Sequence, residues 1–172
     1  FLYVMAEDGT VLAGDRPAMP ASLRLDWPLI SSALSGRSQT GIDVFANSEL
    51  AAISPRLAER ARIEIVPTAE SDAPGSMVEA RGLVLHSAAA VLLPDGRRAA
   101  LVGGILLNRN LDFVDTINDL IYHGSGQPDG IKGTATLFLD DIRVSTNVRL
   151  FGDRRAIGTR VSEEVRSAVL DQ

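Results

Sequence analysis

The sequence predicts an α+β protein in which antiparallel strands dominate and a few helices flank them. Three segments place an acidic turn between two apolar strands: YVMAEDGTVLAG, AAVLLPDGRRAALVGGILL and TLFLDDIRVST. Two further segments have apolar residues at helical spacing. The composition, 45% hydrophobic and 23% charged over 172 residues, is that of a folded domain long enough to bury a core.

The acidic turns predict β-hairpins. Asp8-Gly9 and Asp95-Gly96 are strong turn signals because glycine adopts the positive φ that tight hairpins require. Asp140-Asp141 is a weaker version without glycine, although apolar residues still alternate around it.

Two helices are well marked by their ends. Asn110 can cap a helix that His123 and Gly124 would close, with Asp112 in its first turn. Ser162 can cap a second helix, with acidic residues in its first turn and an apolar stripe behind them.

Two weaker helical signals lie in the first third of the chain. One follows Trp27-Pro28 and ends at Gly36. The other runs from Asn47 to Arg62 and is interrupted by Pro55, which cannot continue a helix.

A linker is expected at residues 123–133, where HGSGQPDGIKG combines several glycines with a proline. It would divide the chain into a first module, 1–122, and a shorter second one, 134–172. A hairpin and a helix of this length are near the lower limit for an independent core, so we expect further strands beyond residue 172.

Charge and composition exclude several classes of protein. A net charge of −5 provides no basic patch for nucleic acid or anionic lipid. The chain has no cysteine, which excludes disulfides and thiolate chemistry but fits either redox compartment. The longest apolar run, AALVGGILL, is shorter than the about 20 residues that a membrane span needs, and no signal peptide is recognised. The chain starts within a strand pattern, which suggests a piece of a longer protein.

Catalytic and metal motifs find no support. No paired histidines stand at ligand spacing, so we predict neither a metal nor a cofactor. GSGQPDG lacks the order of a phosphate-binding loop and is better explained as a linker. A triad of Ser87, His86 and Asp95 fails because neighbouring residues of a strand point to opposite faces. We therefore predict no catalytic residue and no enzymatic activity.

The two histidines have different interpretations. His86 lies in the apolar strand LVLHSAAAV, where it is either a core residue satisfied by one hydrogen bond or a polar anchor in a ligand pocket. His123 is explained by the helix dipole.

Five arginines crowd the last quarter of the chain and allow two interpretations. They either clamp a carboxylate together with nearby threonines and Asn147, or solvate the surface and pair with neighbouring acidic residues. They are Arg143, Arg149, Arg154, Arg155 and Arg160.

The same block resembles the start of the membrane-proximal module of double Cache sensor domains, which occur in bacterial sensor histidine kinases and chemoreceptors. The segment GGILLNRNLDFVDTINDLIY resembles the connection between the two modules of that group. The residues that carry the resemblance are Thr136, Leu137, Phe138, Arg143, Ser145, Thr146, Asn147, Arg155, Ala156, Gly158, Thr159 and Val161.

The resemblance implies a PAS-like antiparallel sheet with flanking helices in each of two tandem Cache modules. The long N-terminal helix and the late strands of the second module are missing here, so we expect that module to be incomplete. The motif of amino-acid-binding double Cache domains is not found, and that ligand is not carried over.

The expected function is a periplasmic ligand-sensing domain of an inner-membrane receptor, more in keeping with a histidine kinase than with a chemoreceptor. It would bind a small polar or anionic molecule and dimerise in the full-length receptor. The alternative is a dimerisation or protein-interaction module that binds no ligand. The residues expected to contact a ligand are Arg81, His86, Asn108, Arg143, Thr146 and Asn147; those expected to be structural are Phe138, Arg155, Gly158 and Thr159.

Overall fold

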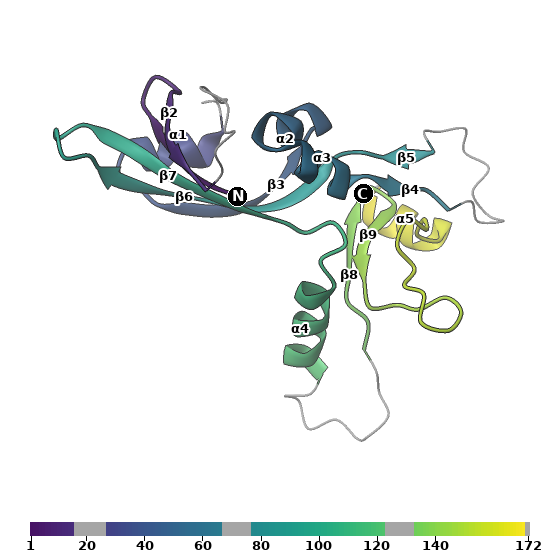
Figure 1. Ribbon diagram of the computed structural model, residues 1–172. Helices are drawn as coiled ribbons and strands as arrows, with labels where there is room; N and C mark the ends of the chain where they lie inside the picture. The colour runs from purple at the N-terminus through teal and green to yellow at the C-terminus, as the bar shows by residue number, and fades with distance from the viewer. Residues whose placement is uncertain (16–26, 67–76, 123–132, 171–172) are drawn as a thin grey trace. The chain divides into compact units, whose positions relative to one another are not determined.

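The computed structural model describes residues 1–15, 27–66, 77–122 and 133–170 (Figure 1). The chain forms two compact units. The sheet unit comprises Phe1–Glu59 and Arg81–Leu106, and the hairpin unit comprises Arg60–Ala80 and Leu107–Gln172.

The sheet unit contains a five-stranded antiparallel sheet in the order β2-β1-β7-β6-β3. Numbered within the sheet along the chain, this order is 2-1-5-4-3. The predicted α+β class with a PAS-like antiparallel sheet is confirmed. The strands are β1 (Leu2–Ala6), β2 (Val11–Gly14), β3 (Gln39–Phe45), β6 (Gly82–Leu92) and β7 (Arg98–Leu106).

Both strong hairpin predictions are confirmed in this sheet. Gly9 and Gly96 have φ of 87° and 83°, values that other residues rarely adopt. Asp8 Oδ1 accepts a hydrogen bond from the backbone N–H of Thr10 at 2.9 Å, so the aspartate fixes the first turn from inside.

Helix α1 (Pro28–Leu34) packs on one face of the sheet (Figure 1). Pro28 starts the helix where a missing N–H costs nothing, and Gly36, with φ of 96°, ends it as predicted. Its buried side chains join those of β1, β6 and β7 in the core: Leu29, Ile30, Ala33, Tyr3, Met5, Ala88, Ala100 and Val102.

Two short helices, α2 (Asn47–Ile53) and α3 (Pro55–Ala61), occupy the segment predicted to be helical with a break. The break falls before Pro55, because proline cannot donate the hydrogen bond that would continue α2. Glu49 Oε2 accepts the N–H of Ala46 at 2.7 Å and so fixes the start of α2.

The hairpin unit contains two small antiparallel pairs and two helices. The third predicted hairpin is confirmed. Its turn requires a positive φ, and since neither turn residue is glycine, Asp140 adopts this conformation with a φ of 51°. The elements are β4 (Ile63–Glu64), β5 (Val78–Glu79), β8 (Thr136–Leu139), β9 (Ile142–Thr146), α4 (Leu111–Tyr122) and α5 (Glu163–Leu170).

The predicted helix starts are also confirmed. Asn110 Oδ1 accepts the N–H of Phe113 at 3.2 Å at the beginning of α4, which packs on β9. Helix α5 begins directly after Ser162. The predicted closure of α4 at His123 and Gly124 lies outside the described residues.

The compact units divide the chain at other residues than the predicted modules. Residues 60–80 and helix α4 group with the C-terminal hairpin rather than with the first sheet, because α4 packs on β9 and the N–H of Val66, just after β4, donates to the carbonyl of Gly158 in the segment that follows β9. Most of the predicted linker, residues 123–132, lies outside the described part of the chain. The assignment of two Cache modules stays a prediction.

Candidate functional site

His86 lies in the middle of β6 on the face that α1 covers, and its side chain is completely buried. Its cross-strand partners are both glycines, Gly41 on β3 and Gly104 on β7. A Cβ atom at Gly104 would lie 2.2 Å from the Cζ atom of Phe1, so the Phe1 ring fills the space over that glycine. At Gly41 a Cβ atom would meet none of the described residues within 4 Å. The space beside the imidazole is therefore filled on the β7 side and open on the β3 side.

Three aromatic rings surround the imidazole. The ring centroids of Phe45, Trp27 and Phe1 lie 5.1, 5.4 and 6.1 Å from that of His86, each in an edge-on arrangement. Trp27 and Phe45 stack on each other at 4.3 Å. These contacts provide an apolar wall of the kind that lines small-molecule sites.

One imidazole nitrogen has a partner and the other has none. Nδ1 lies 3.2 Å from Oδ2 of Asp43, whose side chain is 27% exposed. Because a carboxylate only accepts, Nδ1 carries the proton, and in the neutral ring Nε2 is then an acceptor. Nε2 is buried, and no described residue forms a hydrogen bond with it. Burial lowers the pKa of His86, and the hydrogen bond and charge of Asp43 counter this only in part.

His86 thus has features of both predicted roles, the core residue and the polar anchor of a ligand pocket. It is a core residue with one hydrogen bond, and it also presents an unused polar atom among apolar walls. Asp43 and the three rings were not predicted as neighbours of His86. The one signal was the alternation in QTGIDVF, which places Asp43 on the same face as Gly41 and Phe45.

The other two ligand contacts predicted for the first module belong to different compact units. Arg81 directly precedes β6 in the sheet unit and is half-buried. Asn108 belongs to the hairpin unit, where its buried amide donates to the carbonyl of Ala61 at 2.8 Å. That these residues form one site with His86 stays a prediction.

The three predicted contacts of the second module bond within the hairpin unit. Thr146 shares a 2.6 Å hydrogen bond with the hydroxyl of Thr136, and Asn147 Oδ1 accepts the N–H of Ala135 at 2.8 Å. Arg143 Nη1 donates to the hydroxyl of Thr159 at 2.9 Å. A ligand would have to replace these internal bonds, so their role in binding stays a prediction.

The residues predicted to be structural make specific contacts. Both guanidinium NH₂ groups of Arg155 donate to Asp115 on α4, at 2.9 and 2.8 Å. Gly158 has a φ of 82°, and a Cβ atom there would lie 2.2 Å from the carbonyl oxygen of Glu64. The guanidinium of Arg143 also lies over the ring of Phe138, 5.3 Å from its centroid.

Pairing with neighbouring acidic residues accounts for two of the remaining arginines, one of them in a largely buried pair. Arg160 Nη1 donates to both oxygens of Asp141, at 2.7 and 2.6 Å. Arg149 pairs with the exposed Asp153. The pairing interpretation therefore describes these two better than a carboxylate clamp.

The geometry gives no support to the rejected catalytic triad. Ser87 Oγ lies on the opposite face from His86 and shares a 2.8 Å hydrogen bond with Thr40. Asp95 lies at the hairpin turn and accepts from Arg97. Among the residues described by the structure, no group of three or more His, Asp or Glu side chains could hold a metal ion.

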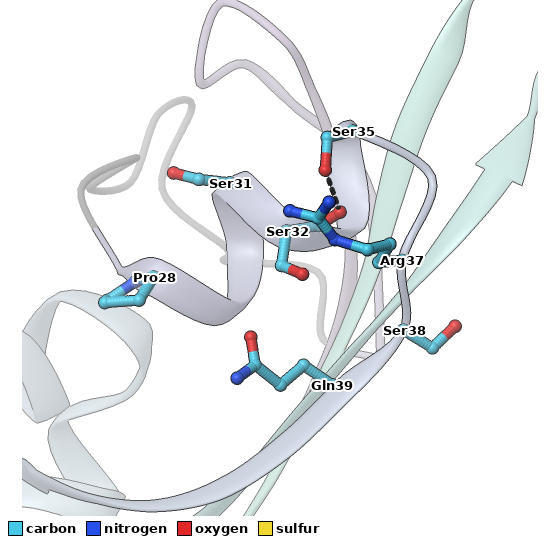
Figure 2. A pocket seen from close by; sticks show the side chains of 7 residues that line it. All are labelled: Pro28, Ser31, Ser32, Ser35, Arg37, Ser38 and Gln39. Atoms are coloured by element: carbon cyan, nitrogen blue, oxygen red, sulfur yellow. Dashed lines mark hydrogen bonds between the residues drawn. The ribbon is translucent and has the colours of Figure 1, made fainter.

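A polar hollow of about 770 Å³ runs along the exposed side of α1 toward the start of β3 (Figure 2). Its walls are serines, one proline, one arginine and one glutamine, and Ser35 Oγ donates to the carbonyl of Ser32 at 2.7 Å. Gln39 at its end is two residues from Gly41 on the same face of β3. The lining residues are Pro28, Ser31, Ser32, Ser35, Arg37, Ser38 and Gln39.

Residues 105–172 match the family described as single Cache domain 3, which is less than half of the chain. The match supports a Cache sensor domain there; Cache domains are generally non-catalytic extracytoplasmic sensors of signalling receptors. No curated protein and no solved structure matches the chain. Within the described ranges no helix is long and apolar enough to cross a membrane.

Proposed function

We propose that the chain is the ligand-sensing input region of a transmembrane signalling receptor, built from two Cache modules. The family match falls within the C-terminal 68 residues, from 105 to 172. A complete 2-1-5-4-3 sheet lies in the other compact unit. A PAS-like sheet in one unit and a Cache match that falls mostly in the other support a double rather than a single Cache arrangement. The receptor would be a periplasmically exposed inner-membrane protein, a sensor histidine kinase in preference to a chemoreceptor.

The ligand site in this proposal is the face of the sheet that bears His86. The observation that carries it is the buried, unpartnered Nε2 atom beside three aromatic rings. A buried polar atom without a hydrogen bond costs about 1–3 kcal/mol, so natural proteins rarely keep one without a use. A small polar molecule that bonds to Nε2 would remove this cost. An anionic ligand would need a protonated His86.

Signalling would follow from a shift in population. A ligand changes an equilibrium only by its different affinity for two states. Strand β7, which pairs with the His86 strand, continues through residues 107–110 into α4. Helix α4 is therefore the element through which we expect occupancy to reach the hairpin unit, and from there the partner subunit of a homodimer.

A thermal-shift panel of small metabolites tests direct sensing. A ligand at a hundredfold excess over its dissociation constant adds about 2.7 kcal/mol, which raises the Tm by roughly 5–10 °C for a domain of this size. His86→Phe keeps the ring and removes both nitrogens, so it should abolish the shift. Ser87→Ala, the neighbouring residue on the opposite face, should not. A broad panel without any shift, or a shift that survives His86→Phe, would refute the site.

A second function is supported by the opposite face of the same sheet. Ile105, Leu85 and Ile42 stand in register on three neighbouring strands, and the two isoleucines are each 56% exposed. An aliphatic row of this kind favours a dimer or a protein partner. Light scattering tests this second function. Ile42→Lys should lower the molar mass of a dimer or complex, whereas Leu92→Lys, at an exposed leucine outside the row, should not.

A further inference from the structure

We infer that the molecule bound at His86 presents an N–H or O–H donor on a compact apolar body and carries no negative charge at that end. This inference rests on the proposed function and narrows it to uncharged or cationic ligands. The site has three properties that together select this chemistry: one acceptor atom, one carboxylate and a set of rings.

The acceptor atom defines the polar contact. Asp43 occupies Nδ1 and thereby leaves Nε2 as a lone-pair acceptor in the neutral ring. A ligand that bonds there must donate. Burial lowers the pKa of His86, so the neutral ring is the form present at neutral pH, and a second N–H directed at an anion is not available.

The charge around the imidazole disfavours an anion. Oδ2 of Asp43 lies 3.2 Å from Nδ1, so a bound carboxylate at Nε2 would approach a like charge across one imidazole ring. The described residues that stack on His86 or pair with it across the sheet are aromatic or glycine, and none of them is Lys or Arg. A cationic ligand would instead benefit from both the carboxylate and the ring faces.

The glycines define where the ligand body would lie. Phe1 fills the space over Gly104, whereas the space over Gly41 is open to at least 4 Å. Gly41 follows Gln39 on the same face of the edge strand β3, and Gln39 lines the hollow beside α1 (Figure 2). Along β3, Gly41 therefore lies between Gln39 at the hollow and the position beside His86, and it has no side chain to fill that space.

Four probes of one shape separate the chemistry: benzylamine, benzyl alcohol, toluene and benzoate. They differ only in the group that would face Nε2. Dissociation constants for the 172-residue chain, with the ¹⁵N signal of His86 Nε2 as a direct reporter, should rank the two donors about five- to tenfold tighter than toluene, which is what one hydrogen bond to a buried atom provides. Benzoate should bind more weakly than toluene.

Three variants separate the contributions of the imidazole, the carboxylate and the open space over Gly41 to binding. His86→Phe should make benzyl alcohol and toluene equal. Asp43→Asn should remove the advantage of benzylamine over benzyl alcohol, and Gly41→Val, which fits a strand and fills the open space, should weaken all four probes at least tenfold. Ser87→Ala is the matched control and should change nothing.

The outcomes separate this inference from the proposed function. Benzoate binding as tightly as benzylamine, with loss in His86→Phe, would overturn the donor chemistry and leave ligand sensing intact. Binding of every probe that is unchanged by His86→Phe, or no binding of any probe, would overturn the inference. The metabolite panel then decides the proposed function independently.

Discussion

Replacing Gly158 by alanine should destabilise the hairpin unit through two separable effects. The first is conformational, because Gly158 has a φ of 82° and a left-handed alanine costs about 1–2 kcal/mol. The second is steric, because the new Cβ atom would lie 2.2 Å from the carbonyl oxygen of Glu64, which belongs to the backbone and cannot rotate away. Moving that backbone threatens the hydrogen bond from Val66 N–H to the Gly158 carbonyl, which is 2.9 Å long.

The magnitude follows from adding these effects. A lost hydrogen bond contributes roughly 0.5–1.5 kcal/mol, so Gly158→Ala should lower the free energy of unfolding by about 1.5–3.5 kcal/mol. Gly152→Ala is the matched control in the same unit: Gly152 has a φ of 62°, but nothing lies within 4 Å of its Cβ position. It should cost only the conformational part, about 1–2 kcal/mol.

Urea unfolding followed by far-UV circular dichroism measures both variants. Trp27, the single tryptophan of the chain, lies in the sheet unit and reports that unit separately by fluorescence. The urea midpoint should fall more for Gly158→Ala than for Gly152→Ala at an unchanged slope. Equal losses for the two variants would refute the close approach of the Gly158 segment to β4.

Three further perturbations follow from single contacts. The pKa of His86 is lowered in the folded chain, so its contribution to stability is complete above pH 6.5, about the pKa of the unfolded chain, and is lost as the pH falls through the pKa of the folded chain. The Tm should therefore drop between pH 7.5 and 5, and it should drop less in His86→Phe. An identical drop in both proteins would contradict this. Arg155→Ala, Asp115→Ala and the double variant should give a coupling of about 0.5–1 kcal/mol in urea, small because Asp115 is 42% exposed, and a coupling of zero would disprove the pair. Gly82→Ala would place a Cβ atom 2.7 Å from Leu50 Cδ1 in the core of the sheet unit and should cost about 1–3 kcal/mol in the Trp27 transition; no change would mean that Leu50 moves aside freely.

Elements fixed by neighbouring residues could be predicted from the sequence. Asp-Gly turns fold hairpins by their own backbone preference, so both strong hairpins were found. The start of α4 depends on one side-chain contact between Asn110 and Phe113, three residues apart. Pro55 marked the break between α2 and α3 in the same local manner.

Elements fixed by distant residues could not be predicted. Strand β3 carries Ile42 on its exposed face, whereas Asp43 points to the covered face. This is the reverse of the usual pattern, in which apolar residues face the core. The alternation of residues along β3 therefore could not predict which face of the strand is covered. Asp43 is stable on that face because His86, forty-three residues away in the chain, donates to it. The partition into two units likewise depends on pairings such as Val66 with Gly158 that no local signal reveals.

The candidate site was only partly visible for the same reason. His86 could be selected as a polar residue in an apolar strand, but its partners come from three other segments. In the hairpin unit the reverse holds: the residues that carried the family resemblance could be identified, whereas their internal bonding could not. Thr146 and Asn147 bond to the strand opposite and to the residue before it, which suits a structural role.

The proposed sensing role of the sheet unit rests on a buried side-chain atom that lacks a hydrogen-bond partner. Within the described residues, three buried side-chain atoms lack a partner: His86 Nε2, Asn118 Oδ1 and Arg143 Nε. Arg143 still donates through Nη1, and Asn118 is half-buried near the surface of α4, so water or a small movement relieves both at low cost. His86 Nε2 differs from these two atoms because the rings of Phe1, Trp27 and Phe45 lie around its imidazole. In the proposed function, a ligand that donates to this atom gains the value of one buried hydrogen bond, and the sheet unit would then be the sensing part.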